Sequence, residues 1–285
     1  MRINKGCFQK IKALALDLDG TALLPDATMG ARTVTALKKI IGSGIQVVFC
    51  TGRAIEAAEP YREALGAEGV MVYFNGAEVV DMPVGAIITL NLLKLEVVDF
   101  CIDMARSMDI HFQIFFPPGI FEGADKWESL VIDKLRPEAD MYRNHTGIIP
   151  IVRDLKSVIS MPVLQGCVKA MYICDPSFHN EIRMKLEQRF GRQIYVAQTF
   201  PSFLEIMNAG VSKGAGLQTA LENRGLSADT VLAIGDEEND LLMFDAAGIC
   251  AAPANARESV KARADFVFAS NAEEGLASFL EEKFL

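Results

Sequence analysis

Short apolar runs alternate with amphipathic stretches along the first part of the chain. The runs at 12–17, 45–50 and 70–74 are apolar almost throughout, which predicts strands buried on both faces. The stretches 30–42 and 54–65 carry apolar residues at helical spacing, and each is followed closely by a glycine, as is typical of helix ends. Because strands and helices alternate, we expect a parallel sheet with right-handed crossovers.

The C-terminal part of the chain shows the same alternation. Expected helices lie at 212–224 and near 238–246, 256–263 and 272–283, and expected strands lie at 230–235, 248–251 and 265–268. Both ends of the sequence therefore predict one α/β core with a parallel sheet.

The middle of the chain has a different pattern. Apolar runs predict strands at 86–92, 110–116, 166–174, 193–199 and 203–207, with helices near 94–108 and 176–190. Two pairs of strands separated by short turns indicate antiparallel pairing, which is typical of an α+β module. We place this module at 84–194, so that it interrupts a core formed by 1–83 and 195–285.

Composition and charge narrow the possible functions. The chain of 285 residues is 51% hydrophobic and 23% charged, as expected of a globular protein, and its formal net charge is −9. That charge argues against a binder of nucleic acid or of anionic membranes. None of the six cysteines forms a CxxC pair, and we find neither a signal peptide nor a span of ~20 apolar residues. We expect a soluble cytoplasmic protein with reduced thiols.

Polar motifs stand where an open parallel sheet binds ligands, beyond the carboxyl ends of the strands. They are Asp17-Leu18-Asp19-Gly20-Thr21, Thr51-Gly52-Arg53, Ser212-Lys213-Gly214 and Asp236-Glu237-Glu238-Asn239-Asp240. By themselves a turn, a helix cap or favourable charge at a helix start would explain most of these residues. Lys213 fits such explanations least, because a cation in the first turn of a helix costs about 0.3–1 kcal/mol. An anion close to Lys213 is indicated.

Taken together, the motifs favour phosphoryl transfer. Several carboxylates form a hard oxygen site suited to Mg²⁺, which prefers few carboxylates and a phosphate oxygen. A threonine hydroxyl, the backbone N–H of Gly52 and the Lys213 ammonium can cradle a phosphate. The sequence has no GxxxxGK[ST] loop, and no GxGxxG follows the first strand, so a P-loop or dinucleotide-binding enzyme is excluded.

These motifs resemble those of the haloacid dehalogenase-like (HAD) superfamily. Its signature combines DxDx[TV], a Thr or Ser after the second strand, a Lys and a late acidic motif. The chain is most similar to the Cof-type branch, which has an α+β cap of type IIB. The matching residues are those of the four motifs above, with Asn75-Gly76-Ala77, Glu205-Ile206 and Asn255-Ala256. The resemblance implies a Rossmann-like parallel-sheet core with an inserted α+β cap domain.

The resemblance also implies roles for individual residues. Asp17 would be the nucleophile that becomes an aspartyl phosphate, and Asp19 would be the general acid and base. On an extended backbone residues i and i+2 point the same way, so both carboxylates could reach one phosphate. Mg²⁺ would be held by Asp17, the Asp19 backbone carbonyl and Asp236, with Asp240 nearby. Thr51, the Gly52 N–H, Lys213 and Asn239 would hold the other phosphate oxygens, with Lys213 also stabilising charge in the transition state.

The expected function is a Mg²⁺-dependent phosphatase acting on a small-molecule phosphate ester, with neither nucleic acid nor a membrane as partner. Sugar phosphates are the first choice by resemblance, followed by cofactor phosphates such as pyridoxal phosphate. A sugar phosphomutase of related fold and a non-catalytic phosphate-sensing protein are the alternatives. A dehalogenase is disfavoured, because that chemistry does not use the second aspartate.

Overall fold

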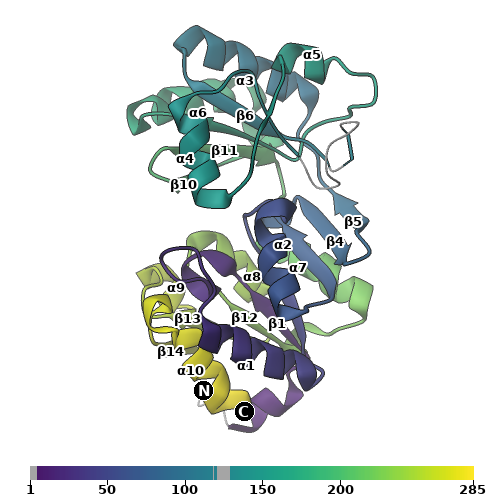
Figure 1. Cartoon of the computed structure of the whole chain (residues 1–285), viewed down its shortest axis with the longest axis vertical. Helices are drawn as coiled ribbons and strands as arrows, with labels where there is room; N and C mark the ends of the chain where they lie inside the picture. The colour runs from purple at the N-terminus through teal and green to yellow at the C-terminus, as the bar shows by residue number, and fades with distance from the viewer. Residues whose placement is uncertain (1–4, 118, 121–128) are drawn as a thin grey trace. The chain divides into compact units, whose positions relative to one another are not determined.

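The computed structural model describes residues 5–117, 119–120 and 129–285 (Figure 1). The chain divides into two compact units. The first contains residues 1–54, 58–89 and 212–285, and the second contains residues 55–57 and 90–211.

The first unit is built on a parallel sheet. Its strands among the described residues are β1 (Ala13–Leu16), β2 (Gln46–Phe49), β12 (Val231–Ile234), β13 (Ile249–Pro253) and β14 (Phe266–Phe268). They run in the order β14-β13-β12-β1-β2, as the α/β alternation predicts. Leu16 pairs with both Phe49 and Ile234. The three strands therefore end at the same level, which places Asp17 beside the residues that follow β2 and β12.

Helices cover both faces of this sheet. The first unit contains α1 (Ala31–Gly42), α7 (Lys213–Arg224), α8 (Leu241–Asp245), α9 (Glu258–Lys261) and α10 (Gly275–Phe284), and most of α2 (Ile55–Leu65). Apolar side chains of α7, α8 and α9 pack with Ala13 and Ala15 on one face. Leu14 and Leu16 point to the opposite face and are also fully buried, so β1 reads as an unbroken apolar run. Helices α1 and α10 lie side by side (Figure 1).

A second, smaller sheet in the first unit has the order β3-β4-β5. It contains β3 (Gly69–Tyr73), β4 (Glu78–Met82) and β5 (Ala86–Leu90). A parallel bridge between Cys50 and Val72 joins the end of β2 to β3. The run 86–92 was expected in the middle module, but β5 belongs with β4 in this sheet. We did not expect β4, which is separated from β3 only by the turn at Phe74–Gly76.

The second unit contains a six-stranded sheet of the order β10-β11-β9-β6-β7-β8 among the described residues. Its strands are β6 (His111–Phe115), β7 (Leu130–Ile132), β8 (Ile151–Val152), β9 (Lys169–Ile173), β10 (Ile194–Phe200) and β11 (Phe203–Asn208). The pairs are antiparallel except β7 with β8. The boundary expected at 194–195 would separate β10 and β11 from this sheet, which they extend. The second unit instead continues to residue 211.

Helices lie on both faces of the six-stranded sheet. They are α3 (Leu95–Met108), α4 (Pro137–Thr146), α5 (Leu155–Ile159) and α6 (His179–Phe190). Helices α3, α5 and α6 share an apolar core with Phe112 and Ile114 of β6. Phe115 points to the other face, where its ring contacts Tyr142 of α4. Of the helices that the structure describes, none is sufficiently long and apolar to cross a bilayer.

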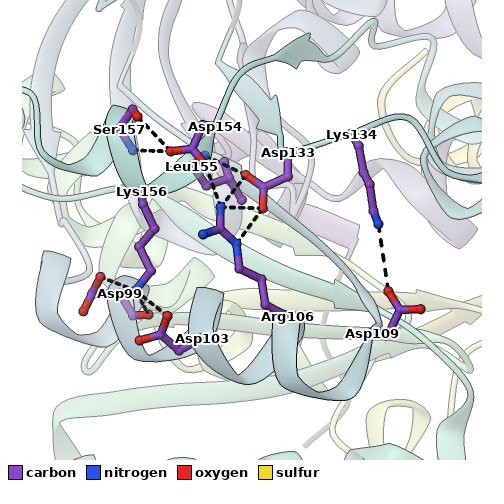
Figure 2. Close-up of polar contacts among 10 residues, drawn as sticks. All are labelled: Asp99, Asp103, Arg106, Asp109, Asp133, Lys134, Asp154, Leu155, Lys156 and Ser157. Carbon is purple, nitrogen blue, oxygen red and sulfur yellow. Dashed lines mark hydrogen bonds and ion pairs between the residues drawn. The ribbon is translucent and has the colours of Figure 1, made fainter.

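A network of ion pairs ties α3 to β7 and α5 (Figure 2). The guanidinium of Arg106 contacts Asp133 at 2.9 Å and Asp154 at 2.7 Å. Asp154 also caps α5, since its carboxylate accepts the backbone N–H of Ser157 at 2.8 Å. Helices α3 and α5 are thereby both held to the end of β7.

Candidate active site

Asp17 and Lys213 form a buried ion pair at the end of β1. The Asp17 N–H continues the sheet by donating to the Ile234 carbonyl oxygen at 3.0 Å, and its side chain is buried. Lys213 is the first residue of α7, whose N-cap is Ser212. Its Nζ donates to Oδ1 of Asp17 at 2.5 Å. The anion that we expected close to Lys213 is therefore a carboxylate of the protein itself.

Asp240 connects Lys213 to the turn after β12. Its Oδ1 accepts a second hydrogen bond from the Lys213 Nζ at 2.7 Å. Its Oδ2 accepts the backbone N–H groups of Asp236 and Glu237 at 2.9 and 3.0 Å. The acidic run 236–240 thus folds into a turn that places Asp236 and Asp240 next to Asp17.

The three buried carboxylates face one ammonium group. Oxygens of Asp17, Asp236 and Asp240 lie within 4.8 Å of one another. Burial raises the pKa of Asp17 well above its usual value. The charge of Lys213 lowers this pKa, but burial outweighs it, and the charges of Asp240 and Asp236 raise the pKa further. Burial, followed by the charge of Asp240, raises the pKa of Asp236 to about 6. Burial alone would lower the pKa of Lys213, but the charges of Asp17 and Asp240 outweigh it and raise that pKa, so Lys213 stays protonated.

This donor set fits a hard divalent cation. The atoms offered are carboxylate oxygens only, which suit Mg²⁺ rather than a soft metal. Among the described residues, these three form the one group of at least three acidic, histidine or cysteine side chains that lie close enough to one another to hold an ion. A divalent charge would offset the excess of negative charge that burial makes unfavourable.

The chain turns sharply after β1 and packs against Asp236. Gly20 has φ 73°, in the left-handed region, and a Cβ added there would lie 2.2 Å from Oδ2 of Asp236. Only glycine fits this approach without displacing the carboxylate. The next residue, Thr21, donates its hydroxyl to Oδ1 of Asp236 at 2.8 Å.

The Asp19 carboxylate is paired with Arg53 and does not join the three-carboxylate cluster. Its Oδ2 accepts from Nε of Arg53 at 2.7 Å, and its Oδ1 accepts from Nη2 at 2.6 Å. Arg53 is buried and lies over the ring of Tyr61, whereas the Asp19 side chain is 42% exposed. No role was expected for Arg53 from the sequence, although its place in the Thr51-Gly52-Arg53 motif after the second strand was the available signal.

Thr51, Gly52 and Asn239 are linked through Asn75. Thr51 is buried, and its hydroxyl oxygen accepts the Arg53 N–H at 3.1 Å. The Asn75 backbone N–H donates to the Thr51 carbonyl oxygen at 2.9 Å. The Asn75 side chain abuts Gly52 and accepts from Nδ2 of Asn239 at 3.1 Å. Asn75 was noted in the sequence only as part of a motif.

A pair of asparagines from the C-terminal part of the unit holds the turn after β1. Asn255 donates its Nδ2 to the Gly20 carbonyl oxygen at 2.8 Å and accepts the Asn271 N–H at 3.0 Å. Asn271 in turn donates its Nδ2 to the Leu23 carbonyl oxygen at 2.8 Å. The turn that contains Asp19 is therefore also held by residues from the C-terminal part of the chain.

Comparison with known proteins places this chain in a family. The model of the haloacid dehalogenase-like hydrolases matches residues 14–280. Pyridoxal phosphate phosphatase YbhA of Escherichia coli is 24% identical over 277 residues, which cover 94% of this chain and 97% of the relative. The 5-amino-6-(5-phospho-D-ribitylamino)uracil phosphatase YitU of Bacillus subtilis is 28% identical over 276 residues, covering 95% and 97%.

Solved structures agree with the sequence comparison. A haloacid dehalogenase-like hydrolase from Bacteroides thetaiotaomicron superposes with a TM-score of 0.86 at 27% identity, over 96% of this chain and all of that one. The fold expected from the sequence, an α/β core with an α+β insertion, is confirmed by this likeness. The chain belongs to the haloacid dehalogenase-like hydrolase family.

Proposed function

We propose that this chain is a Mg²⁺-dependent phosphatase that hydrolyses phosphate monoesters of small metabolites through an aspartyl phosphate on Asp17. The observation that carries the proposal is the buried Asp17 carboxylate, which contacts the Lys213 ammonium and lies within 4.8 Å of Asp236 and Asp240. Such a group is a nucleophile only if a cation neutralises its encounter with an anionic phosphate.

The metal would be held by the carboxylates of Asp17 and Asp236 and by the backbone carbonyl of Asp19. Both oxygens of Asp240 already accept hydrogen bonds from the protein, so we assign this residue to positioning Lys213 and the turn at Asp236. When bound, the ion neutralises charge on the carboxylates and the phosphate and polarises the phosphorus–oxygen bonds.

The residues of the chain would then carry out two displacements at phosphorus. In the first, an Asp17 oxygen bonds to phosphorus while the bond to the leaving oxygen breaks, and Asp19 gives that oxygen a proton. In the second, Asp19 takes a proton from water, whose oxygen bonds to phosphorus and frees Asp17 with release of inorganic phosphate. Each Asp19 oxygen accepts one hydrogen bond from Arg53 and has a second lone pair for the proton, so this contact can stay in both steps.

Binding of the phosphate falls to groups around this centre. We assign its non-reacting oxygens to Lys213, the Thr51 hydroxyl, the Gly52 N–H and the Asn239 amide. In the transition state these donors would stabilise the charge that spreads over the equatorial oxygens. The first unit would thus be the catalytic core, and the second would be the cap domain.

Two substrate classes deserve a direct comparison. The family resemblance favours sugar phosphates, whereas the names of YbhA and YitU point to phosphate esters that carry a heterocyclic ring. A panel containing both classes and a chromogenic phosphate ester, assayed for released phosphate with Mg²⁺ and with a chelator, tests the proposal. We expect release only with the metal and none from Asp17→Asn.

The same assay separates the alternatives. A phosphomutase would give isomerised product without inorganic phosphate, and a phosphate-sensing protein would bind phosphate without turnover. Near-normal activity of Asp17→Ala would refute the assignment of the nucleophile.

A further inference from the structure

Asn75 stands in a strained turn that is held firmly against the loop after β2. It has φ 56° and ψ 25°, the left-handed conformation that asparagine tolerates better than most residues. Its backbone N–H donates to the Thr51 carbonyl oxygen at 2.9 Å, and the Phe74 N–H donates to that of Arg53 at 3.0 Å. The following Gly76 packs so closely that a Cβ there would lie 2.2 Å from the Ser212 carbonyl oxygen. The turn therefore touches the segments of Thr51 and Lys213.

The Asn75 side chain is buried between two groups that the proposed function assigns to phosphate binding. A Cβ added at Gly52 would lie 3.1 Å from its Oδ1 and 3.3 Å from its Nδ2. Nδ2 of Asn239 donates to the same Oδ1 at 3.1 Å. Oδ1 of Asn239 is buried without a hydrogen-bond partner among the described residues. A buried acceptor left in this way costs about 1–3 kcal/mol.

Rotation of both amides by 180° removes this cost. Nδ2 of Asn75 would then donate to Oδ1 of Asn239, and Nδ2 of Asn239 would occupy the position where the unpartnered oxygen now lies. In that arrangement the Asn239 N–H group is free to donate to a phosphate oxygen. In the present arrangement that position holds the Asn239 oxygen, which would repel a phosphate oxygen beside it.

We propose that Asn75 is a positioning residue that orients the Asn239 amide so that its N–H group, and not its oxygen, faces the bound phosphate. The inference rests on the proposed function, because it takes the role of Asn239 from there. It explains why an amide stands at position 75, since its N–H group can hold the Asn239 oxygen away from the phosphate.

Two substitutions at this position separate orientation from support of the fold. Aspartate keeps the size of the side chain and tolerates the left-handed backbone, but it can only accept, so it would fix Asn239 with its oxygen toward the phosphate. Glycine also suits the backbone and leaves Asn239 free to rotate. A purely structural role would make Asn75→Asp the milder change, whereas the orienting role makes it the more severe one.

The measured quantity is the affinity for inorganic phosphate in the presence of Mg²⁺, by calorimetry and as inhibition of a chromogenic phosphate ester. We expect Asn75→Asp to weaken binding by about 10- to 100-fold, the effect of losing one charge-assisted hydrogen bond. Asn75→Gly should weaken it less than Asn75→Asp, with melting curves that show folded protein in each case. Binding as tight in Asn75→Asp as in the wild type would overturn the proposal.

A double-mutant cycle excludes simple repulsion by the new charge. If the introduced carboxylate acts through Asn239, Asn75→Asp adds less than about twofold to the loss caused by Asn239→Ala. An undiminished effect of Asn75→Asp in the Asn239→Ala background would overturn the proposal. Should the aspartate variant not fold, Asn75→Gly replaces it in the cycle. Its effect on phosphate affinity should likewise nearly disappear in the Asn239→Ala background, and an undiminished effect would overturn the proposal. Calorimetry with inorganic phosphate needs no turnover, so a failure of the proposed function would be seen separately, as absent phosphate release by the wild type.

Discussion

At the scale of single residues, the position of the Asp19 carboxylate depends on the guanidinium of Arg53. The pair is bidentate, with distances of 2.7 and 2.6 Å, and Arg53 is itself held by burial and by the ring of Tyr61. A planar fork fixes both oxygens of a carboxylate, which a lysine ammonium cannot do. General acid–base catalysis contributes about 10²–10⁴-fold and requires correct placement of the acid.

Replacement of Arg53 should therefore reduce the proposed activity mainly in kcat. We expect Arg53→Ala to lower kcat by about 10- to 100-fold, and Arg53→Lys by less, because the charge remains without the fork. Steady-state kinetics measures both. In an Asp19→Asn background the loss should nearly disappear, since Arg53 acts through Asp19, and an equal loss in that background would count against this role.

The sequence predicted some of these residues and not their partners. Asp17, Lys213, Asp236 and Asp240 could be grouped because parallel strands end at one edge of the sheet. The prediction that Asp17 and Asp19 point the same way assumed an extended backbone. Asp17 and Asp19 do have extended dihedral angles, but the chain turns at Gly20, which has φ 73°, and the Asp19 side chain meets Arg53. Such turn angles cannot be read from periodicity.

At the scale of elements, the C-terminal part of the first unit makes hydrogen bonds to the segment that links β1 to α1. Asn255 binds the Gly20 carbonyl oxygen, and Asn271 binds that of Leu23. Farther along, the Glu274 carboxylate accepts the N–H groups of Arg32 and Thr33, each at 3.2 Å, and so caps α1. The turn that contains Asp19 is thus restrained by Arg53 at Asp19 and by Asn255 at Gly20.

Loss of the hydrogen bonds made by Asn255 should affect catalysis more than overall stability. We expect Asn255→Ala to lower the free energy of unfolding by about 1 kcal/mol and kcat by about tenfold, because the Asp19 turn becomes mobile. Denaturant unfolding and steady-state kinetics measure the two effects. Ser259→Ala is the matched control, since Ser259 makes only an exposed 3.4 Å contact with Glu238. An unchanged kcat in Asn255→Ala would contradict this role.

The ion-pair network of Figure 2 has a structural consequence in the second unit. Arg106→Ala should lower the free energy of unfolding by about 1 kcal/mol, since Arg106 serves Asp133 and Asp154 together but is partly exposed. The difference from the wild type should shrink in high salt, which screens exposed pairs. Melting curves at low and high ionic strength check this, and a salt-independent difference would point to lost packing instead.

Element length decided which parts of the fold the sequence could predict. The core strands β1 to β3 and the helices α1, α2 and α7 begin and end within one residue of their expected bounds. The strands β7 and β8 have three and two residues, too few to show a period. Helix α4 was also missed, because only Ala139 and Tyr142 of its ten residues are buried and no apolar stripe marks it.

At the scale of the whole molecule, stability and metal binding should be linked. The chain has a net charge of −9, and its candidate active site brings together three buried carboxylates and one ammonium group. Without a cation this cluster destabilises the folded state, whereas an ion that binds only the folded state stabilises it.

Mg²⁺ should therefore reverse the stability order of the wild type and Asp236→Asn. In chelator the variant should be the more stable protein, because it has one buried charge fewer and keeps an oxygen for Thr21. Saturating Mg²⁺ should raise the unfolding free energy of the wild type by about 2.7 kcal/mol at 100 times Kd and that of the variant by much less. Thermal melts with and without the ion test this, and equal shifts in both proteins would place the metal elsewhere.

The most direct test of the account is to find where the phosphoryl group resides during turnover. With a chromogenic aryl phosphate, whose leaving group departs without a proton, Asp19→Asn should form the intermediate but hydrolyse it slowly. Acid quenching of this variant with that substrate should then trap phosphate on the peptide that contains Asp17. Peptide mass spectrometry identifies the modified residue, and borohydride reduction should convert it to homoserine. Phosphate on Asp17, absent from Asp17→Asn, is the predicted result. Phosphate on another residue, or full turnover without any phosphorylated protein, would contradict the central claim.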